Sequence, residues 1–147
     1  MSARADDPAW QRIDKKGIKS GSVEFGLGNL FGITCPASLP TAQPRLILHV
    51  QVLQTDYNEK SRYNLRVVIN DYRADFGMKV KDGSLYFDAA DFNQRDVFGG
   101  FVQALIQAAQ AGADHAQIAV SSLGWRDDLP LAAADKVLAG LMDGCGE

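Results

Sequence analysis

Residues 74–87 have the sequence ADFGMKVKDGSLYF, and this stretch decides the fold class. Up to Val80 its apolar residues occupy every second position, which is the period of a strand with one buried face. Asp82-Gly83 then separates this run from a second apolar run, Leu85-Tyr86-Phe87. Asp-Gly between two such runs is the strongest short signal for a tight hairpin. These residues therefore predict two antiparallel strands joined by a short turn.

The same alternation extends from this hairpin toward the N-terminus. Residues 45–53 and 63–69 each have apolar side chains at every second position, so both predict strands. A polar segment over residues 54–62 separates them, and Asn70-Asp71 is a turn signal after the second. The middle of the chain therefore predicts an antiparallel β-meander.

A first hairpin is expected upstream of this meander. Residues 22–27 and 30–35 have strand-like content, and Gly28-Asn29 between them can adopt the positive φ angles of a tight turn. Three prolines follow, which disfavour both helix and sheet pairing: Pro36, Pro40 and Pro44. We expect a linker there.

Toward the C-terminus the period changes to that of helices. Between Val97 and Ala111 apolar residues recur at steps of three and four, with Asp96 as a cap before them and Gly112 after them. The segments expected next are a strand over residues 117–121, a loop over 124–128, and a helix from Pro130 to Gly144. Strands followed by helices predict an α+β fold: a mostly antiparallel sheet with two C-terminal helices on one face.

The composition predicts one soluble domain, and the N-terminal residues predict that the protein is exported. The chain has 147 residues, of which 46% are hydrophobic and 22% charged, as in an ordinary globular domain. Residues 1–9 are interpreted as a leader and residues 10–147 as the domain. Ala3-Arg4-Ala5 has the small-x-small form that signal peptidases recognise, so the leader is interpreted as a signal-peptide remnant. This predicts a periplasmic or secreted protein.

The two cysteines support the same compartment. Cys35 ends an early strand, and Cys145 lies two residues before the C-terminus. A bridge between them would tie the last helix to the sheet and stabilise the fold by about 4 to 5 kcal/mol in the chain-entropy model. The alternative is two unrelated thiols, one of them a small buried side chain. We predict the disulfide.

Several classes of partner are not expected. The net charge of -3 argues against a nucleic-acid-binding protein, which is usually strongly basic. No apolar run is long enough to span a membrane. The glycines between Gly26 and Gly32 precede a strand and lack nucleotide-binding spacing, and His49 and His115 have no metal-ligand spacing. No cofactor and no metal are therefore predicted.

Catalytic motifs are equally sparse. Ser121 and Ser122 lack the sequence of a nucleophile elbow. The acidic segment from Asp88 to Asp96 lacks EF-hand spacing and is interpreted as a loop and helix cap. A hydrolase-type site would have to assemble in space from His49, His115 and acidic residues. No catalytic residue is assigned, and the protein is interpreted as non-enzymatic.

Aromatic residues beside polar loops are the candidate binding residues. Tyrosine and tryptophan in such places are favoured for contact with a partner. The candidates are Tyr57, Tyr63, Tyr72 and Trp125. The alternative is that they cover the ends of the sheet.

The order of these features resembles that of small exported bacterial proteins such as the invasion-associated locus B family. The features are Ile33-Thr34-Cys35, the strands between Arg45 and Phe87, the helix from Val97, the strand from Gln117, and Leu129-Pro130-Leu131 leading to Cys145. The resemblance implies a periplasmic or surface location and a non-enzymatic role. It transfers no catalytic residue.

We therefore expect an exported binding protein that acts on a protein or envelope component, with inhibitors and immunity proteins included in this class. A small hydrolase is the first alternative. A cytoplasmic ligand-binding domain is the second, and free thiols would favour it.

Overall fold

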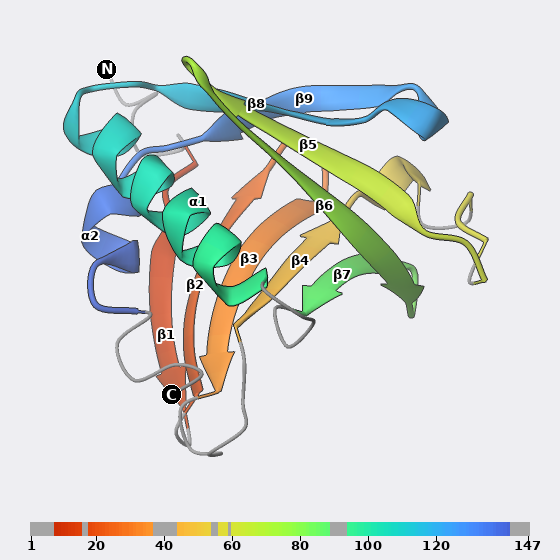
Figure 1. The fold of residues 1–147 in the computed structure, drawn as a ribbon, viewed down its shortest axis with the longest axis horizontal. Coiled ribbons are helices and arrows are strands. Elements are labelled where there is room, and N and C mark those ends of the chain that lie inside the picture. Colours follow the sequence, from red (N-terminus) through yellow and green to blue (C-terminus); the bar gives the residue numbers. More distant parts are fainter. Residues whose placement is uncertain are drawn as a thin grey trace.

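We analyse the fold in a computed structural model of the chain (Figure 1), which describes residues 8–15, 18–36, 44–53, 56–58, 60–88 and 94–141. Within these residues the protein is an α+β structure. Its strands are β1 (Gln11–Lys15), β2 (Ile18–Phe25), β3 (Asn29–Pro36), β4 (Arg45–His49), β5 (Tyr63–Ile69), β6 (Tyr72–Lys81), β7 (Ser84–Asp88), β8 (His115–Val120) and β9 (Trp125–Pro130). Its helices are α1 (Gln94–Gln110) and α2 (Ala134–Leu138), and two 3₁₀ turns are η2 (Gln51–Leu53) and η3 (Ser121–Leu123).

The strands form one antiparallel sheet, in the order β1-β2-β3-β4-β7-β6-β5-β8-β9. The predicted antiparallel sheet is confirmed, but its order is not a simple meander. Strand β4 pairs with β7 instead of β5, so β4 to β7 have the spatial order of a Greek key. The segment between β4 and β5 must therefore cross from one side of the three-stranded unit to the other.

The β5–β6 and β6–β7 hairpin turns lie where the sequence predicts them, but the β2–β3 turn is at residues 26–28 instead of Gly28-Asn29, because Asn29 of β3 already pairs with Phe25. Asp82 and Gly83 both have positive φ, at 54° and 78°, and join β6 to β7. Asn70, at 53°, begins the turn between β5 and β6. The hairpin around Gly28 is also present, with β2 and β3 paired from Phe25↔Asn29 onward. These turns depend on local backbone preferences, which the residue types reveal directly.

Two predictions for the C-terminal part are wrong. The expected loop over residues 124–128 is an edge strand, β9, paired with β8 along its whole length. Pro130 ends this strand instead of opening a helix, which begins only at Ala134. Three consecutive exposed residues in β9 hide the alternation that would identify a strand. Its pairing comes from the backbone, and a proline is tolerated on an edge strand.

The predicted strand over residues 45–53 is shorter than expected. Strand β4 ends at His49, and Gln51–Leu53 form the 3₁₀ turn η2. The buried side chain of Asn29 accepts a hydrogen bond from the Gln51 backbone N–H at 3.0 Å, which turns the chain away from the sheet. This contact joins the β2–β3 turn to η2.

The hydrophobic core lies between α1 and the inner face of the curved sheet (Figure 1). Phe98 and Phe101 of α1 are fully buried. Phe101 contacts Phe31 of β3 and Phe76 of β6, with ring centroids 6.4 Å and 5.0 Å away. Phe98 lies parallel to Phe87 of β7 at 6.0 Å. One helix therefore packs against strands from both halves of the sheet.

Neither helix in the described residues is long and apolar enough to cross a membrane.

Trp10 connects the two edge strands of the sheet, β1 and β9. Its backbone N–H donates to the carbonyl of Ala132 at 2.9 Å, and its indole Nε1–H donates to the carbonyl of Pro130 at 2.7 Å. The ring is buried and lies 5.9 Å from Phe31. The start of β1 is thereby held against the end of β9, although these strands do not pair.

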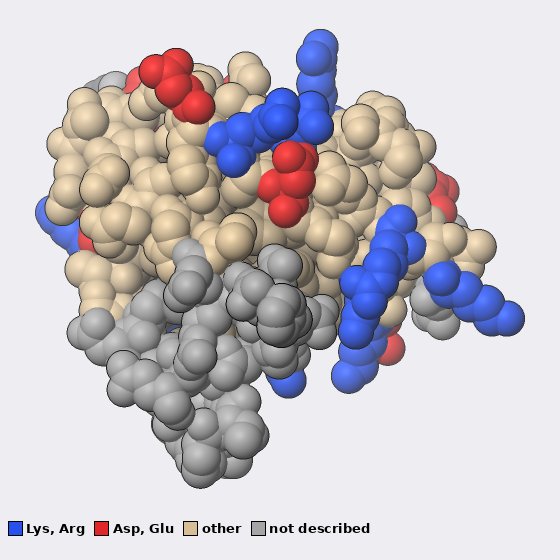
Figure 2. All heavy atoms as spheres, in the orientation of Figure 1, with Lys and Arg blue, Asp and Glu red and all other residues tan. Residues whose placement is uncertain are grey.

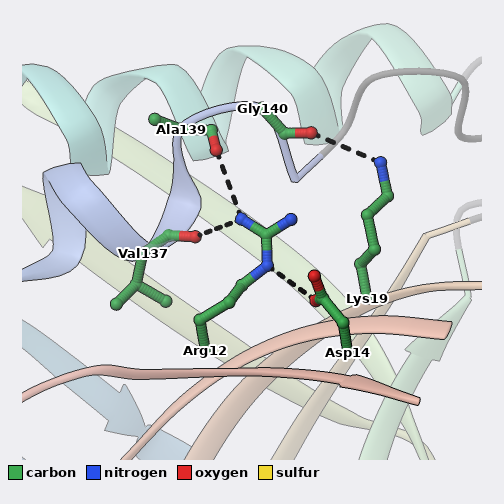
Figure 3. A network of polar contacts seen from close by, with 6 residues as sticks. All are labelled: Arg12, Asp14, Lys19, Val137, Ala139 and Gly140. Carbon is green, nitrogen blue, oxygen red and sulfur yellow. Dashed lines mark hydrogen bonds and ion pairs between the residues drawn. The ribbon is translucent and has the colours of Figure 1, made fainter.

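Helix α2 packs on β2 at Gly21, which has no side chain. A β-carbon at Gly21 would lie 2.8 Å from Val137 Cγ1 and 3.1 Å from Leu138 Cδ2, so only glycine fits without displacement. Basic residues of β1 and β2 then hold the chain that follows α2 (Figure 3). Arg12 Nη1 donates to the carbonyls of Val137 and Ala139, and Lys19 Nζ donates to that of Gly140.

We predict that Phe101→Ala lowers the free energy of unfolding by about 3 to 5 kcal/mol, because it leaves a cavity where ring contacts from two halves of the sheet meet. Urea denaturation measures this value. Gln103→Ala, at an exposed position of the same helix, is the control and should change it by less than about 0.5 kcal/mol. Equal effects of the two substitutions would contradict the packing of α1 described above.

Candidate functional site

Exposed apolar side chains gather at one end of the curved sheet, which we call the loop end. The strand register puts the β2–β3 turn, η2, the start of β5 and η3 at this end; the turn packs against η2, and η3 contacts β5 and β9. Leu27 is 89% exposed and Val52 is 71% exposed, the two highest values among the large apolar residues of the described chain. We define the apolar rim as Leu27, Val52, Tyr57, Leu123 and Trp125; the last three are half-buried.

Local contacts hold Leu27 and Val52 in their exposed positions. Gly28 has a φ of +85°, and a β-carbon there would lie 3.2 Å from Cβ of Gln51. The turn therefore packs directly against η2, and the hydrogen bond from Gln51 to Asn29 fixes the two together. Both apolar side chains are presented by short, tied turns instead of by a long loop.

The start of β9 lies beside the same turn. A β-carbon at Gly26 would lie 3.6 Å from Oδ2 of Asp127, two residues after Trp125. Trp125 itself pairs in register with Val120, the last residue of β8. The β2–β3 turn is thus flanked by η2 and by β9.

Tyr57 and Tyr63 form a tilted ring pair at this end, with ring centroids 5.5 Å apart and ring planes inclined by 58°. The Asn58 backbone N–H donates to the hydroxyl of Tyr63 at 2.8 Å. The hydroxyl of Tyr57 is buried and has no hydrogen-bond partner among the described residues. Burial first, then the neighbouring Tyr63 and Asp56, raises the pKa of Tyr57 to about 12.

Three of the four candidate residues from the sequence lie together. Tyr57, Tyr63 and Trp125 are at the loop end, although Tyr63 is only 8% exposed and mainly supports Tyr57. Tyr72 lies at the far end of the β5–β6 hairpin, beside Gly100 of α1, and burial raises its pKa. Sequence reasoning missed Leu27, whose signal was its position between two glycines, and Val52.

A second candidate surface lies on the outer face of β5, β8 and β9. It is a hollow of about 490 Å³ lined by Arg66, Val68, Gln117, Ile118, Ala119, Arg126, Asp127 and Asp128. Figure 2 shows basic and acidic side chains lying next to each other over β5 and β6. No pattern in the sequence indicates this hollow, because its residues come from three separate strands.

The histidines do not come together in the sheet. His49 of β4 has Nδ1 2.9 Å from Ser84 Oγ and Nε2 3.1 Å from Gln51 Oε1. His115 of β8 has Nε2 3.9 Å from Asp128 Oδ2, and both side chains are more than half exposed. Strands β7, β6 and β5 separate the two histidines. The side chains from Asp88 to Asp96 lie outside the described residues, and the remaining described side chains form no group of three potential metal ligands.

Comparisons of the chain with protein-family models, with curated proteins and with solved structures give no match. The resemblance to the invasion-associated locus B family therefore stays a prediction.

We predict that Tyr57→Phe leaves the protein as stable as the wild type or stabilises it by up to about 1 kcal/mol at neutral pH, because it removes a buried hydroxyl without a partner. The raised pKa adds a second signature. The unfolded state ionises first as the pH rises, so the wild type should lose stability between pH 10 and about 12 more steeply than the variant. Urea unfolding across this interval measures both effects.

Tyr63→Phe is the matched control for this experiment. It removes the hydroxyl that accepts a hydrogen bond from Asn58, so it should destabilise the fold by about 1 kcal/mol. If Tyr57→Phe proves to be the more damaging of the two, the Tyr57 hydroxyl has a partner in solution.

Proposed function

We propose that this protein is an exported, non-enzymatic binding protein whose apolar rim contacts a protein or envelope partner. The observation that carries the proposal is the pair of exposed aliphatic side chains, Leu27 and Val52, at the same end of the sheet as the half-buried Tyr57 and Trp125. Inhibitors and immunity proteins, which act by covering another protein, belong to this class.

The rim has the composition of a contact surface. Each Å² of apolar surface removed from water contributes about 25 cal/mol, so covering two exposed aliphatic side chains is favourable. Aromatic residues such as Trp125 and Tyr57 often supply the largest contributions to binding when they are covered centrally. Leu27 and Val52 are also held by short turns, so a partner would not have to order these two side chains' segments.

Contacts at the opposite end of the sheet support the proposed disulfide. Cys35 is fully buried and lies opposite Lys19 in the β2–β3 register. Lys19 Nζ donates to the carbonyl of Gly140, so the last described residues lie close to this end of β3 (Figure 3). A β-carbon at Gly21, two residues from Lys19, would lie 3.5 Å from Leu141 Cδ1.

Cys145 lies outside the described residues, and the bridge stays a proposal. It is the fourth residue after Leu141, a span of at most about 14 Å in an extended chain. The position of Leu141 therefore puts Cys35 within reach of the C-terminal segment. A disulfide of this kind persists in an oxidising compartment, which supports a periplasmic or secreted location.

We predict that a photoreactive amino acid at position 27 or 52 yields one shared, discrete adduct in the cells that make this protein, because both positions would face the same partner. Positions 18 and 97, occupied by the exposed Ile18 and Val97, are the controls and should not give that adduct. Val52→Asp should abolish the adduct from position 27 while changing the free energy of unfolding by less than about 0.5 kcal/mol. Adducts that are the same at all four positions would contradict a binding role for the rim.

We also predict that Cys35 and Cys145 take up no alkylating reagent when native protein is trapped at lysis without reductant. Intact mass measures the outcome, and a reduced sample in denaturant provides the fully labelled control. Labelling of both thiols in the native sample would remove the support for export and favour a cytoplasmic ligand-binding domain.

A further inference from the structure

Two arginines face each other across the outer hollow. Arg66 of β5 is in register with Ala119 of β8, and Ala119 is in register with Arg126 of β9. Adjacent strands lie about 4.8 Å apart, so the two arginine Cα atoms are about 10 Å apart. Ala119 between them has the smallest side chain on the floor of the hollow. The space above it is within reach of both guanidinium groups.

Arg66 is held in place on its other side. Its Nε donates to Oδ1 of Asp75 at 2.9 Å, and Nδ2 of Asn64 donates to the same oxygen at 3.0 Å. Arg73 Nε lies 3.6 Å from the second oxygen. The hydrogen bonds from Asn64 and Arg66 lower the pKa of Asp75, which keeps this carboxylate ionised. Neither Nη group of Arg66 has a hydrogen bond to another described residue.

Arg126 is exposed and has no hydrogen bond or ion pair with the described part of the chain. The hollow thus contains one positioned guanidinium and one that is available to bind. Guanidinium groups bind carboxylate and phosphate oxygens through paired hydrogen bonds, and two of them on opposite sides can bind one oxyanion.

Two carboxylates limit the size of the anion that would fit. Asp127 lies toward the β2–β3 turn at Gly26, and Asp128 lies 3.9 Å from His115 at the other side of the hollow. Both line the hollow, so a long polyanion would meet repulsion beyond the two arginines. A single small oxyanion held between the two guanidinium groups would meet less of this repulsion.

We infer that the outer hollow is a binding site for a small oxyanion, either a carboxylate or a phosphate, held between Arg66 and Arg126 above Ala119. The ligand is a small molecule that either is this oxyanion or carries it as an acidic group. This inference does not depend on the rim, because the two surfaces use different side chains.

The test is a titration of the ¹⁵N-labelled protein with inorganic phosphate and, separately, with malonate, at an ionic strength of about 0.15 M. We expect saturable shifts of the backbone amides of Arg66, Gln117, Ala119 and Arg126. Arg126→Gln should weaken binding about tenfold or more, because it removes charge-assisted hydrogen bonds. Ala119→Leu should also weaken it, because the side chain would fill the space above the floor.

Lys79→Gln is the control. It removes the same charge from an exposed position of β6 that does not line the hollow, so it should change affinity by less than about twofold. Tighter binding of phosphate or of malonate would identify the preferred oxyanion, and either result supports the site. Shifts that do not saturate, or that Lys79→Gln weakens as much as Arg126→Gln does, would overturn it in favour of general attraction to positive charge. Because Ala119→Leu keeps every charge, it retains this distinction even if Arg126→Gln disturbs the fold.

Discussion

The packing of Phe98 and Phe101 against the inner face of the sheet is the interaction on which the rest of the structure depends. These two rings contact phenylalanines from β3, β6 and β7 at the same time. The sheet curves around that helix, so its inner face packs against α1 and its outer face carries the hollow (Figure 1).

Two sets of contacts tie β1 and β2 to the C-terminal part of the chain. At the start of β1, Trp10 donates two hydrogen bonds to the chain that leaves β9, and its ring joins the aromatic core through Phe31. Beside this point, Gly21 of β2, which is in register with Arg12, lets α2 approach, and Arg12 and Lys19 bind carbonyls of α2 and of the segment after it. The edge strand β1 is thereby held against the chain that follows β9, although β1 and β9 do not pair with each other.

Sequence reasoning succeeded where the determinants are local. The Asp82-Gly83 turn, the period of α1 and the alternation in β5 and β6 each follow from neighbouring residues, and all are present. It failed for β9, whose exposed residues have no period, and for the position of β4 beside β7. Both depend on pairing between segments distant in sequence, which periodicity does not specify.

The candidate sites divide in the same way. Aromatic residues beside a polar loop identified Tyr57 and Trp125, because residue type and local context suffice for that inference. The arginine pair is different. Arg66 and Arg126 meet only through the register of β8 with both neighbours, and a slip of one residue in either pairing would move an arginine to the inner face. No pattern near either residue encodes that register.

The pleat of β9 explains how one short strand can serve two surfaces with different chemistry. Successive side chains of a strand point to opposite faces. Trp125, at the loop end, and Arg126, which lines the hollow, therefore point to opposite faces of β9. Pairing with β8 along the whole strand fixes this alternation. An apolar partner at the rim and an oxyanion in the hollow would therefore be recognised by adjacent residues that do not share a face. For that reason a charge-neutral change at Ala119 and an apolar-to-acidic change at Val52 can be interpreted independently of each other.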